Sequence, residues 1–130
     1  MLPESHLDLL SDEKPSLAYL ATTMPDGSPQ VTPIWFSYSN GELWINTRTG
    51  RVKEKNMSAR PQVALVIQDP SETYRFLQIR GEASGPIQDG AVEHIDRLSH
   101  KYDGKPFRSL LPNEGRVIFK IDPRSVSVEE

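Results

Sequence analysis

Short hydrophobic runs separated by turn residues make up most of the chain, and this pattern predicts strands rather than long helices. Val31 to Tyr38 alternates with hydrophobic residues on both of its faces, which indicates a strand covered on both sides. Asn40-Gly41 follows, and because both residues tolerate positive φ, they predict a hairpin that pairs this strand with the next one. Five further strands are predicted at Leu17 to Thr23, Glu42 to Asn46, Gln62 to Gln68, Tyr74 to Ala83, and Arg116 to Asp122, where Pro123 ends the last one.

Three helices are predicted between these strands. The first is a short N-terminal helix from Pro3 to Leu10, with Leu7 and Leu10 turned inward. The second follows Gly50 and ends before Pro61, which cannot continue a helix. The third begins after Gln88-Asp89-Gly90, and its apolar stripe consists of Ala91, Val92, Ile95, Leu98 and Tyr102.

Together these elements predict one domain over residues 1–130, mainly β with inserted helices, folded as a small closed or partly closed antiparallel barrel. A barrel of this size has a filled interior, so a large ligand must bind outside it. A groove between two subunits is the natural place for such a ligand.

Composition and charge exclude several classes of function. The chain has no Cys, and its three His are too scattered to predict a metal site. The net charge of −3 argues against a general nucleic-acid binder. There is no apolar run of transmembrane length and no export leader, so we expect a cytoplasmic protein without a membrane partner.

The segment from Asn46 to Pro61 inverts the sign of the chain's charge. It carries five cationic residues against the single Glu54, a net charge of +4. Lys or Arg at a helix start is unfavourable, and a bound phosphate would offset that cost. This predicts an anion site in which Thr47, Thr49, Arg51 and Lys53 bind phosphate, although such residues are also ordinary solvated surface residues.

A second polar surface is predicted on the strand from Tyr74 to Ala83. Alternation places Tyr74, Gln78 and Arg80 on one face and Arg75 on the other. Solvated strand charge is the alternative interpretation of both arginines.

Several separated motifs together resemble a known superfamily. They are Leu20-Ala21-Thr22, Asp26 to Trp35, Asn46-Thr47, Gly50 to Asn56, Tyr74-Arg75-Phe76 and Arg80-Gly81. In this succession the chain resembles the pyridoxamine 5′-phosphate oxidase-like, FMN-binding split-barrel superfamily. It resembles most its flavin/deazaflavin oxidoreductases, in the branch that uses coenzyme F-420. The resemblance runs from about Pro15 to Val126.

The resemblance implies a split β-barrel homodimer with two cofactor sites at the interface. In such proteins the residues matching Arg51 and Lys53 hold the cofactor phosphate, and a partner subunit contributes the strand matching Tyr74 to Arg80, which includes Arg75 and Gln78. Residues matching Gln30, Thr32 and Pro33 lie along the ring system of the cofactor. Weaker matches to cofactor-binding residues are Asn46, Thr47 and Asn56. Asn56 as a helix brace and Trp35 as a core residue remain open alternatives.

The implied activity is hydride transfer from reduced F-420 to a small conjugated substrate. F-420 carries a phosphodiester and glutamates, to which Lys55, Arg60 and Arg48 could add charge, whereas FMN needs fewer cations. The alternatives are an FMN-dependent split-barrel oxidoreductase and a non-catalytic flavin-, deazaflavin- or haem-binding protein. No catalytic residue is assigned.

Overall fold

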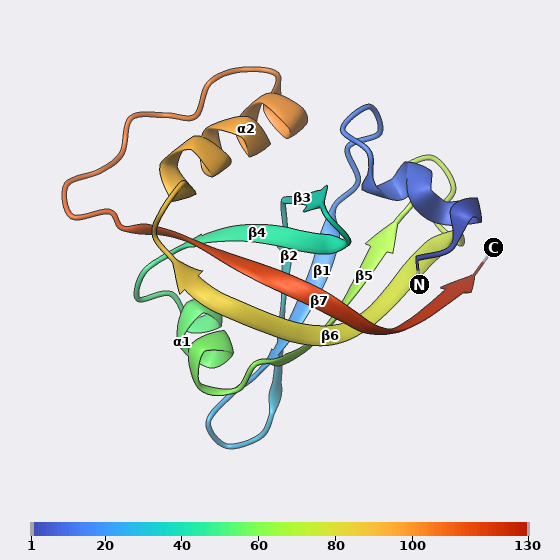
Figure 1. Cartoon of the computed structure of the whole chain (residues 1–130), viewed down its shortest axis with the longest axis horizontal. Coiled ribbons are helices and arrows are strands. Elements are labelled where there is room, and N and C mark those ends of the chain that lie inside the picture. The colour runs from blue at the N-terminus through green and yellow to red at the C-terminus, as the bar shows by residue number, and fades with distance from the viewer. Residues whose placement is uncertain (1, 130) are drawn as a thin grey trace.

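The computed structural model of the chain describes residues 2–129. Seven strands and three helices account for most of it (Figure 1). In chain order they are η1 (Glu4–Leu10), β1 (Ala18–Thr23), β2 (Pro29–Ile34), β3 (Phe36–Ser39), β4 (Glu42–Arg48), α1 (Val52–Ala59), β5 (Gln62–Gln68), β6 (Phe76–Ile87), α2 (Ala91–Asp103) and β7 (Arg116–Glu129).

All seven strands form one antiparallel sheet in the order β2-β1-β5-β6-β7-β4-β3. The sheet curls so that β4, β6 and β7 face β1 and β5 across the interior (Figure 1). This confirms the prediction of a mainly β, antiparallel fold of the split-barrel kind.

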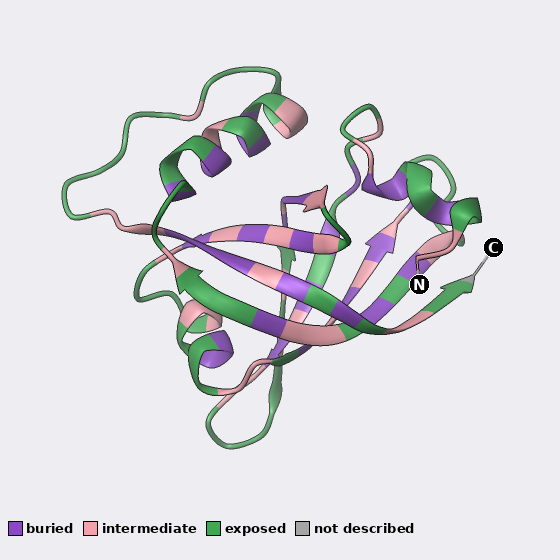
Figure 2. Cartoon of the chain, viewed as in Figure 1, coloured by how far each residue is buried: buried purple, intermediate pink, exposed green. Residues whose placement is uncertain are grey.

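The strands alternate between buried and more exposed residues because every second side chain points into the curl (Figure 2). Leu20, Ile45, Leu65, Ile79 and Phe119 meet there and are at most 4% exposed. Each large apolar side chain buried in this way contributes about 1.5–3 kcal/mol to folding. The interior is filled with side chains, as expected for a barrel of this size.

The Asn40-Gly41 hairpin is confirmed, with φ of 53° and 78° at the two residues and Ser39 paired to Glu42. The prediction of one strand over Val31 to Tyr38 is wrong. The chain bends at Trp35, so that β2 pairs with β1 whereas β3 pairs with β4. Because β2 and β3 are the two edges of the sheet, this bend brings its two ends together.

The prediction that Pro123 ends the last strand is also wrong. Between Arg80 and Gly81 the β6–β7 register shifts, so that Gly81 pairs with Pro123 and Arg80 with Ser125. The extra residue, Arg124, makes a bulge that accommodates the missing proline N–H. On the other strand, β6 begins at Phe76, two residues later than predicted, and continues to Ile87.

Two predicted inward side chains point outward instead. Leu7 is 40% exposed, because η1 is a 3-10 helix whose three-residue period buries His6 and Leu9. Val92 is 51% exposed, and His94 occupies the buried side of α2. This helix covers the outer side of β4 and β7, where Ile118 is buried as well.

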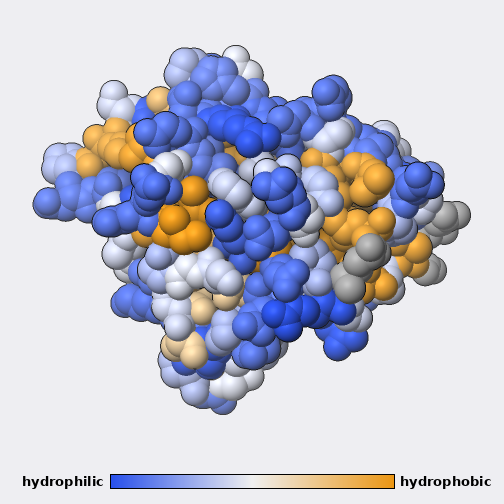
Figure 3. Space-filling view, viewed as in Figure 1, coloured by the Kyte–Doolittle hydropathy of each residue, from blue (hydrophilic) through white to orange (hydrophobic). Residues whose placement is uncertain are grey.

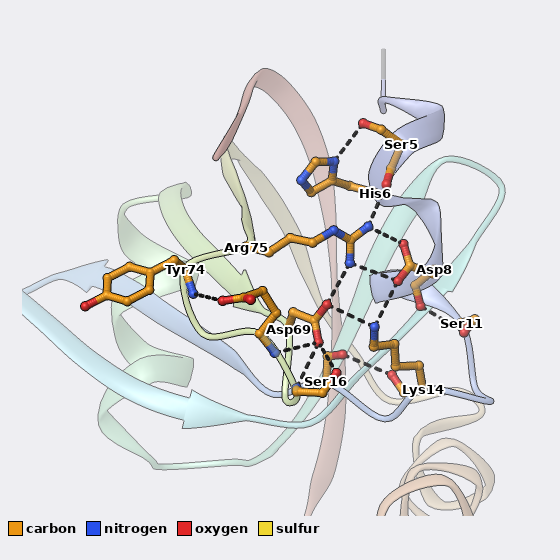
Figure 4. Close-up of polar contacts among 11 residues, drawn as sticks. Ser5, His6, Asp8, Ser11, Lys14, Ser16, Asp69, Tyr74 and Arg75 are labelled. Atoms are coloured by element: carbon orange, nitrogen blue, oxygen red, sulfur yellow. Dashed lines mark hydrogen bonds and ion pairs between the residues drawn. The ribbon is translucent and has the colours of Figure 1, made fainter. Parts of the chain in front are cut away.

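An ion-pair cluster ties η1 to the turn between β5 and β6 (Figure 4). Arg75 Nη2 lies 2.7 Å from Asp8 Oδ1, and Arg75 Nη1 lies 2.8 Å from Asp69 Oδ2. Lys14 Nζ approaches the same two carboxylates at 3.2 and 3.0 Å. The hydrogen bond from Arg75 is the main cause that lowers the pKa of Asp8 to about 2.

Over the part of the chain that the structure describes, no helix is both long and apolar enough to cross a membrane.

Candidate functional site

A pocket of about 530 Å³ opens beside the start of α1. The bend at Trp35, the end of β4, the helix α2 and the loop 104–115 surround it. It is lined by Leu17, Pro33, Ile34, Trp35, Asn46, Thr47, Arg48, Arg51, Lys53, Ile95, Leu98, Phe107, Arg108 and Arg116.

All lining residues except Asn46 and Thr47 are of two kinds. Half of the whole lining set is apolar or aromatic, and Trp35 among these residues stacks on Tyr102 with ring centroids 5.3 Å apart and an interplanar angle of 4°. The stacking fixes the orientation of the indole. Five others are cationic, namely Arg48, Arg51, Lys53, Arg108 and Arg116. Such a pocket suits a ligand that has both a flat apolar part and an anionic part.

Lys53 is the cation with the greatest need of an anionic ligand. Its Nζ donates to the neutral Thr32 Oγ1 at 3.1 Å. Within residues 2–129 it takes part in no ion pair. Burial, and then the nearby charges of Arg51 and Arg116, lower its pKa. A bound anion would counter both effects, because it stabilises the charged form of the lysine.

Arg116 and Arg108 were missed by the sequence analysis. Arg116 is 9% exposed in its side chain, and its Nε donates to Asn46 Oδ1 at 2.9 Å. It pairs with Arg48 in the β4–β7 register, so two arginines from distant segments become neighbours. Only the strand pairing brings them together, and the sequence carries no direct signal of it.

Glu114 holds the loop 104–115 in place over the pocket. Its carboxylate is fully buried and accepts from Arg108 at 2.8 Å, from Arg116 at 3.2 Å and from the Leu111 N–H at 2.8 Å. The bond from Arg108 is the main cause that lowers the pKa of Glu114 to about 2. Phe107 is also held, since the Arg108 and Arg116 guanidinium groups lie 4.8 and 5.4 Å from its ring centroid.

The pocket brings together five of the residues assigned to a cofactor site from the sequence: Pro33, Asn46, Thr47, Arg51 and Lys53. Thr32 contacts Lys53 and so stands beside them. The side-chain amide of Asn46 forms its hydrogen bonds inside the protein, with Ala91, His94 and Arg116. Its position therefore supports the pocket wall.

Four other assigned residues are not part of the pocket lining. Gln30 accepts from Thr22, and Thr49 binds the Gly115 carbonyl through its N–H. Lys55 is exposed on α1. Asn56 is 2% exposed and donates to Thr22 Oγ1 at 3.0 Å, which makes it a brace between α1 and β1.

The residues expected from a partner subunit also lie outside this pocket. Tyr74 is 79% exposed, and Figure 4 shows its ring directed away from the ion-pair cluster that contains Arg75. Gln78 and Arg80 project from the outer face of β6, where Arg80 lines a second cavity of about 440 Å³. Their contribution to a shared site stays a prediction.

In the described residues, no three His, Cys, Asp or Glu side chains form a group that could hold a metal ion.

The donors of this pocket fit a phosphate-bearing flavin-type cofactor. Arg51 and Lys53 lie at the start of α1, where partial positive charge already favours anions. The apolar lining from Pro33 to Trp35 and from α2 offers a surface for a ring system. The half-buried charge of Lys53, which has no ion-pair partner among the described residues, is the observation that favours such a ligand.

The fold is that of a split-barrel protein, and the pocket is suited to a flavin-type cofactor. The family model described as pyridoxamine 5′-phosphate oxidase matches residues 2–129. The chain therefore belongs to the pyridoxamine 5′-phosphate oxidase family, whose character supports an oxidoreductase role.

Solved structures share this fold. A protein called F420 reductase is 34% identical, with a TM-score of 0.85, and the match covers 97% of this chain and 98% of that one. A conserved hypothetical protein from Mycobacterium tuberculosis is 22% identical, with a TM-score of 0.75 and coverage of 100% and 86%. HupZ from Group A Streptococcus is 17% identical, with a TM-score of 0.68 and coverage of 97% and 92%.

Proposed function

We propose that this protein is an oxidoreductase that uses reduced coenzyme F-420 to reduce a small conjugated substrate. The observation that carries the proposal is the joining of five cationic side chains and an apolar wall in one pocket. The 34% identity to a protein called F420 reductase, over almost the full length of both chains, supports the choice of F-420. FMN is the alternative cofactor.

In this proposal the side chains at the start of α1 bind the phosphodiester. Arg51 and Lys53 supply charge, and Thr32 keeps the Lys53 ammonium in place. Arg48 extends the positive surface beyond the phosphate site, where it suits the glutamates of F-420. FMN has no such tail and would leave this charge unused.

The apolar wall orients the ring and excludes water from it. Ile34 and Trp35 form one side of this wall, and Ile95 and Leu98 of α2 form another. When bound, reduced F-420 supplies the hydride, so the chain needs to provide only position and electrostatics. The substrate then occupies the rest of the pocket, beneath the loop that Glu114 fixes.

We also propose that the active form is a homodimer. The outer face of β1 and β2 exposes hydrophobic side chains, with Tyr19 at 37% and Val31 at 60%. Tyr19 pairs with Pro33 on one side and Val66 on the other, so this apolar surface is continuous across three strands. A second copy of the chain would bury it. It would also bring in the strand with Gln78 and Arg80.

Turnover tests the proposal. The purified protein is mixed with reduced F-420 and a panel of quinones and conjugated lactones, and oxidation of the cofactor is followed by absorbance. Substrate-dependent oxidation that disappears in Lys53→Ala supports a reductase. Tight binding of F-420 without turnover of any acceptor would instead favour a carrier protein. Light scattering tests the dimer, and a monomer that binds cofactor fully would contradict the shared site.

A further inference from the structure

A chain of polar side chains runs from the interior to the pocket and connects four elements. Ser37 Oγ on β3 and His94 Nε2 on α2 are hydrogen-bonded at 2.9 Å. His94 Nδ1 lies 3.2 Å from Asn46 Nδ2 on β4, and Asn46 Oδ1 lies 2.9 Å from Arg116 Nε on β7. Ser37 and His94 are only 1% and 5% exposed, so water does not compete for the bond between them.

The contacts of Asn46 determine which way its amide points. Its Nδ2 also donates to the Ala91 carbonyl at 2.8 Å, while its Oδ1 accepts from Arg116. A flipped amide would set oxygen against the carbonyl and NH₂ against the guanidinium group, losing both bonds. The amide nitrogen must therefore face His94.

This orientation in turn fixes the protonation of His94. Since Asn46 Nδ2 is a donor, His94 Nδ1 must be an unprotonated acceptor, and the ring proton sits on Nε2 and is donated to Ser37 Oγ. Burial, and then the charges of Arg97 and Arg116, lower the pKa of His94 to about 4. The neutral ring that the geometry requires is thus also the favoured form at neutral pH.

Arg116 receives its orientation from this chain. Its Nε donates to Asn46 Oδ1, and its Nη1 donates to the Glu114 carboxylate at 3.2 Å. Two anchors on one planar group fix the plane of the guanidinium. In this plane it lines the pocket together with Arg48 and Lys53.

We propose that His94 is a positioning residue for the anion site: it holds the amide of Asn46, which holds the guanidinium of Arg116 in the pocket wall. The identity of the anion as part of F-420 rests on the proposed function, but the positioning does not. Its nearest probe is therefore inorganic pyrophosphate, and a second readout needs no ligand at all.

The ligand-free readout is the ¹⁵N–¹H signal of Arg116 Nε, identified by its loss in Arg116→Gln. In the wild type we expect a sharp signal protected from exchange. His94→Leu should lose that protection, and pyrophosphate should bind about threefold to tenfold more weakly, the effect of one hydrogen bond. His94→Gln keeps an acceptor and a donor and should restore both.

Two controls separate positioning from mere stability. Ser99→Ala removes another buried bond of α2, from Ser99 Oγ to the Lys105 carbonyl at 2.8 Å, and should lower stability without changing the Arg116 signal or the affinity. In the Arg116→Gln background, His94→Leu should cause no further loss of affinity. A further loss of the same size, or an unchanged Arg116 signal in folded His94→Leu, would overturn the proposal.

The wild-type protein gives a test that needs no variant to fold. Imidazole ¹⁵N shifts at neutral pH should show a protonated Nε2 and an unprotonated Nδ1 on His94. A proton on Nδ1 would overturn the proposal. Failure of F-420 to bind while these results hold would reject the proposed function alone.

Discussion

The Lys53 ammonium and the Thr32 hydroxyl lie 3.1 Å apart, so a half-buried cation has a neutral partner. Arg51 and Arg116 stand close enough to lower the pKa of Lys53 further. A protein gains nothing in stability from such a grouping of like charges. A ligand that brings negative charge gains most from it, and for this reason we place the anion at Lys53.

Replacing Lys53 by Ala should weaken the binding of F-420 and of FMN alike. Loss of one charge-assisted contact costs about 1.5–3 kcal/mol of binding free energy. Isothermal titration of the folded variant measures the change. Unchanged affinity would remove Lys53 from the site.

Lys55→Ala is the matched control on the same helix. Lys55 is exposed and outside the pocket lining, so FMN affinity should not change. A loss of F-420 affinity that is smaller than in Lys53→Ala, with FMN affinity unchanged, would indicate that Lys55 contacts the glutamate tail. Equal losses of affinity for F-420 and FMN would contradict the assignment of Lys53 to the phosphate and of Lys55 to the tail.

Trp35 should report ligand binding by its fluorescence, because it lines the pocket. Trp44 should not, since its Nε1 is buried and the side chain packs beside His94, with ring centroids 5.9 Å apart. Trp35→Phe should therefore abolish most of the change in emission on ligand binding, and Trp44→Phe should preserve it. The reverse result would place the ligand elsewhere.

Gly81→Ala should destabilise the fold by about 1–3 kcal/mol, the usual cost of overpacking. A Cβ at this position would collide with the backbone carbonyl of Asp122 at the bulge opposite Pro123. Urea denaturation measures the loss. Ser84→Ala, at an exposed position of the same strand, should change stability little, and equal stability of the two variants would contradict the close approach.

Stability should fall on acidification between about pH 6.5 and pH 4. His94 has a pKa lowered from 6.5 to about 4, so in this range the unfolded chain binds a proton that the folded one excludes. The free energy of unfolding should drop by on the order of 2–3 kcal/mol as the pH falls through this window. His94→Gln should show a smaller drop in urea denaturation, and parallel curves for the two proteins would contradict a buried neutral His94.

Below this window the carboxylates add their own loss. Asp8 and Glu114 have pKa values lowered to about 2. Their stabilising effect is present above the pKa values of the unfolded chain, near pH 4, and is lost as the pH falls toward 2.

Asp69→Asn should lower the melting temperature more than Asp8→Asn at pH 7, because the Asp69 side chain is 4% exposed and that of Asp8 44%. Equal melting temperatures would contradict this order.

Local patterns were enough to predict most of the elements. The Asn40-Gly41 turn needs only the two residues that accept positive φ, and α2 is bounded by Gly90 and Gly104, both left-handed. The errors arose where distant strands decide the outcome. Trp35 reads as the middle of a strand, but the two halves join opposite edges of the sheet. Pro123 reads as a strand end, but a bulge opposite Gly81 accommodates it.

The candidate site was predictable where its residues are consecutive. Arg51 and Lys53 come from one short basic segment, and the pocket includes both. Arg116 and Arg108 come from a part of the chain that shows no cluster of charge, and they reach the pocket through the β4–β7 pairing and the Glu114 contacts. The loop 104–115 also carries exposed Leu110 and Leu111, and Figure 3 shows hydrophobic surface on this left side of the face and a second hydrophobic area on its right.

The most direct test of the central claim is a titration of the purified apo-protein with F-420 and, separately, with FMN, followed by tryptophan and cofactor fluorescence. We predict micromolar or tighter binding of F-420 and clearly weaker binding of FMN, since only F-420 engages the cations beyond the phosphate. A preference for FMN would contradict the deazaflavin assignment. Binding of neither would contradict the cofactor pocket itself.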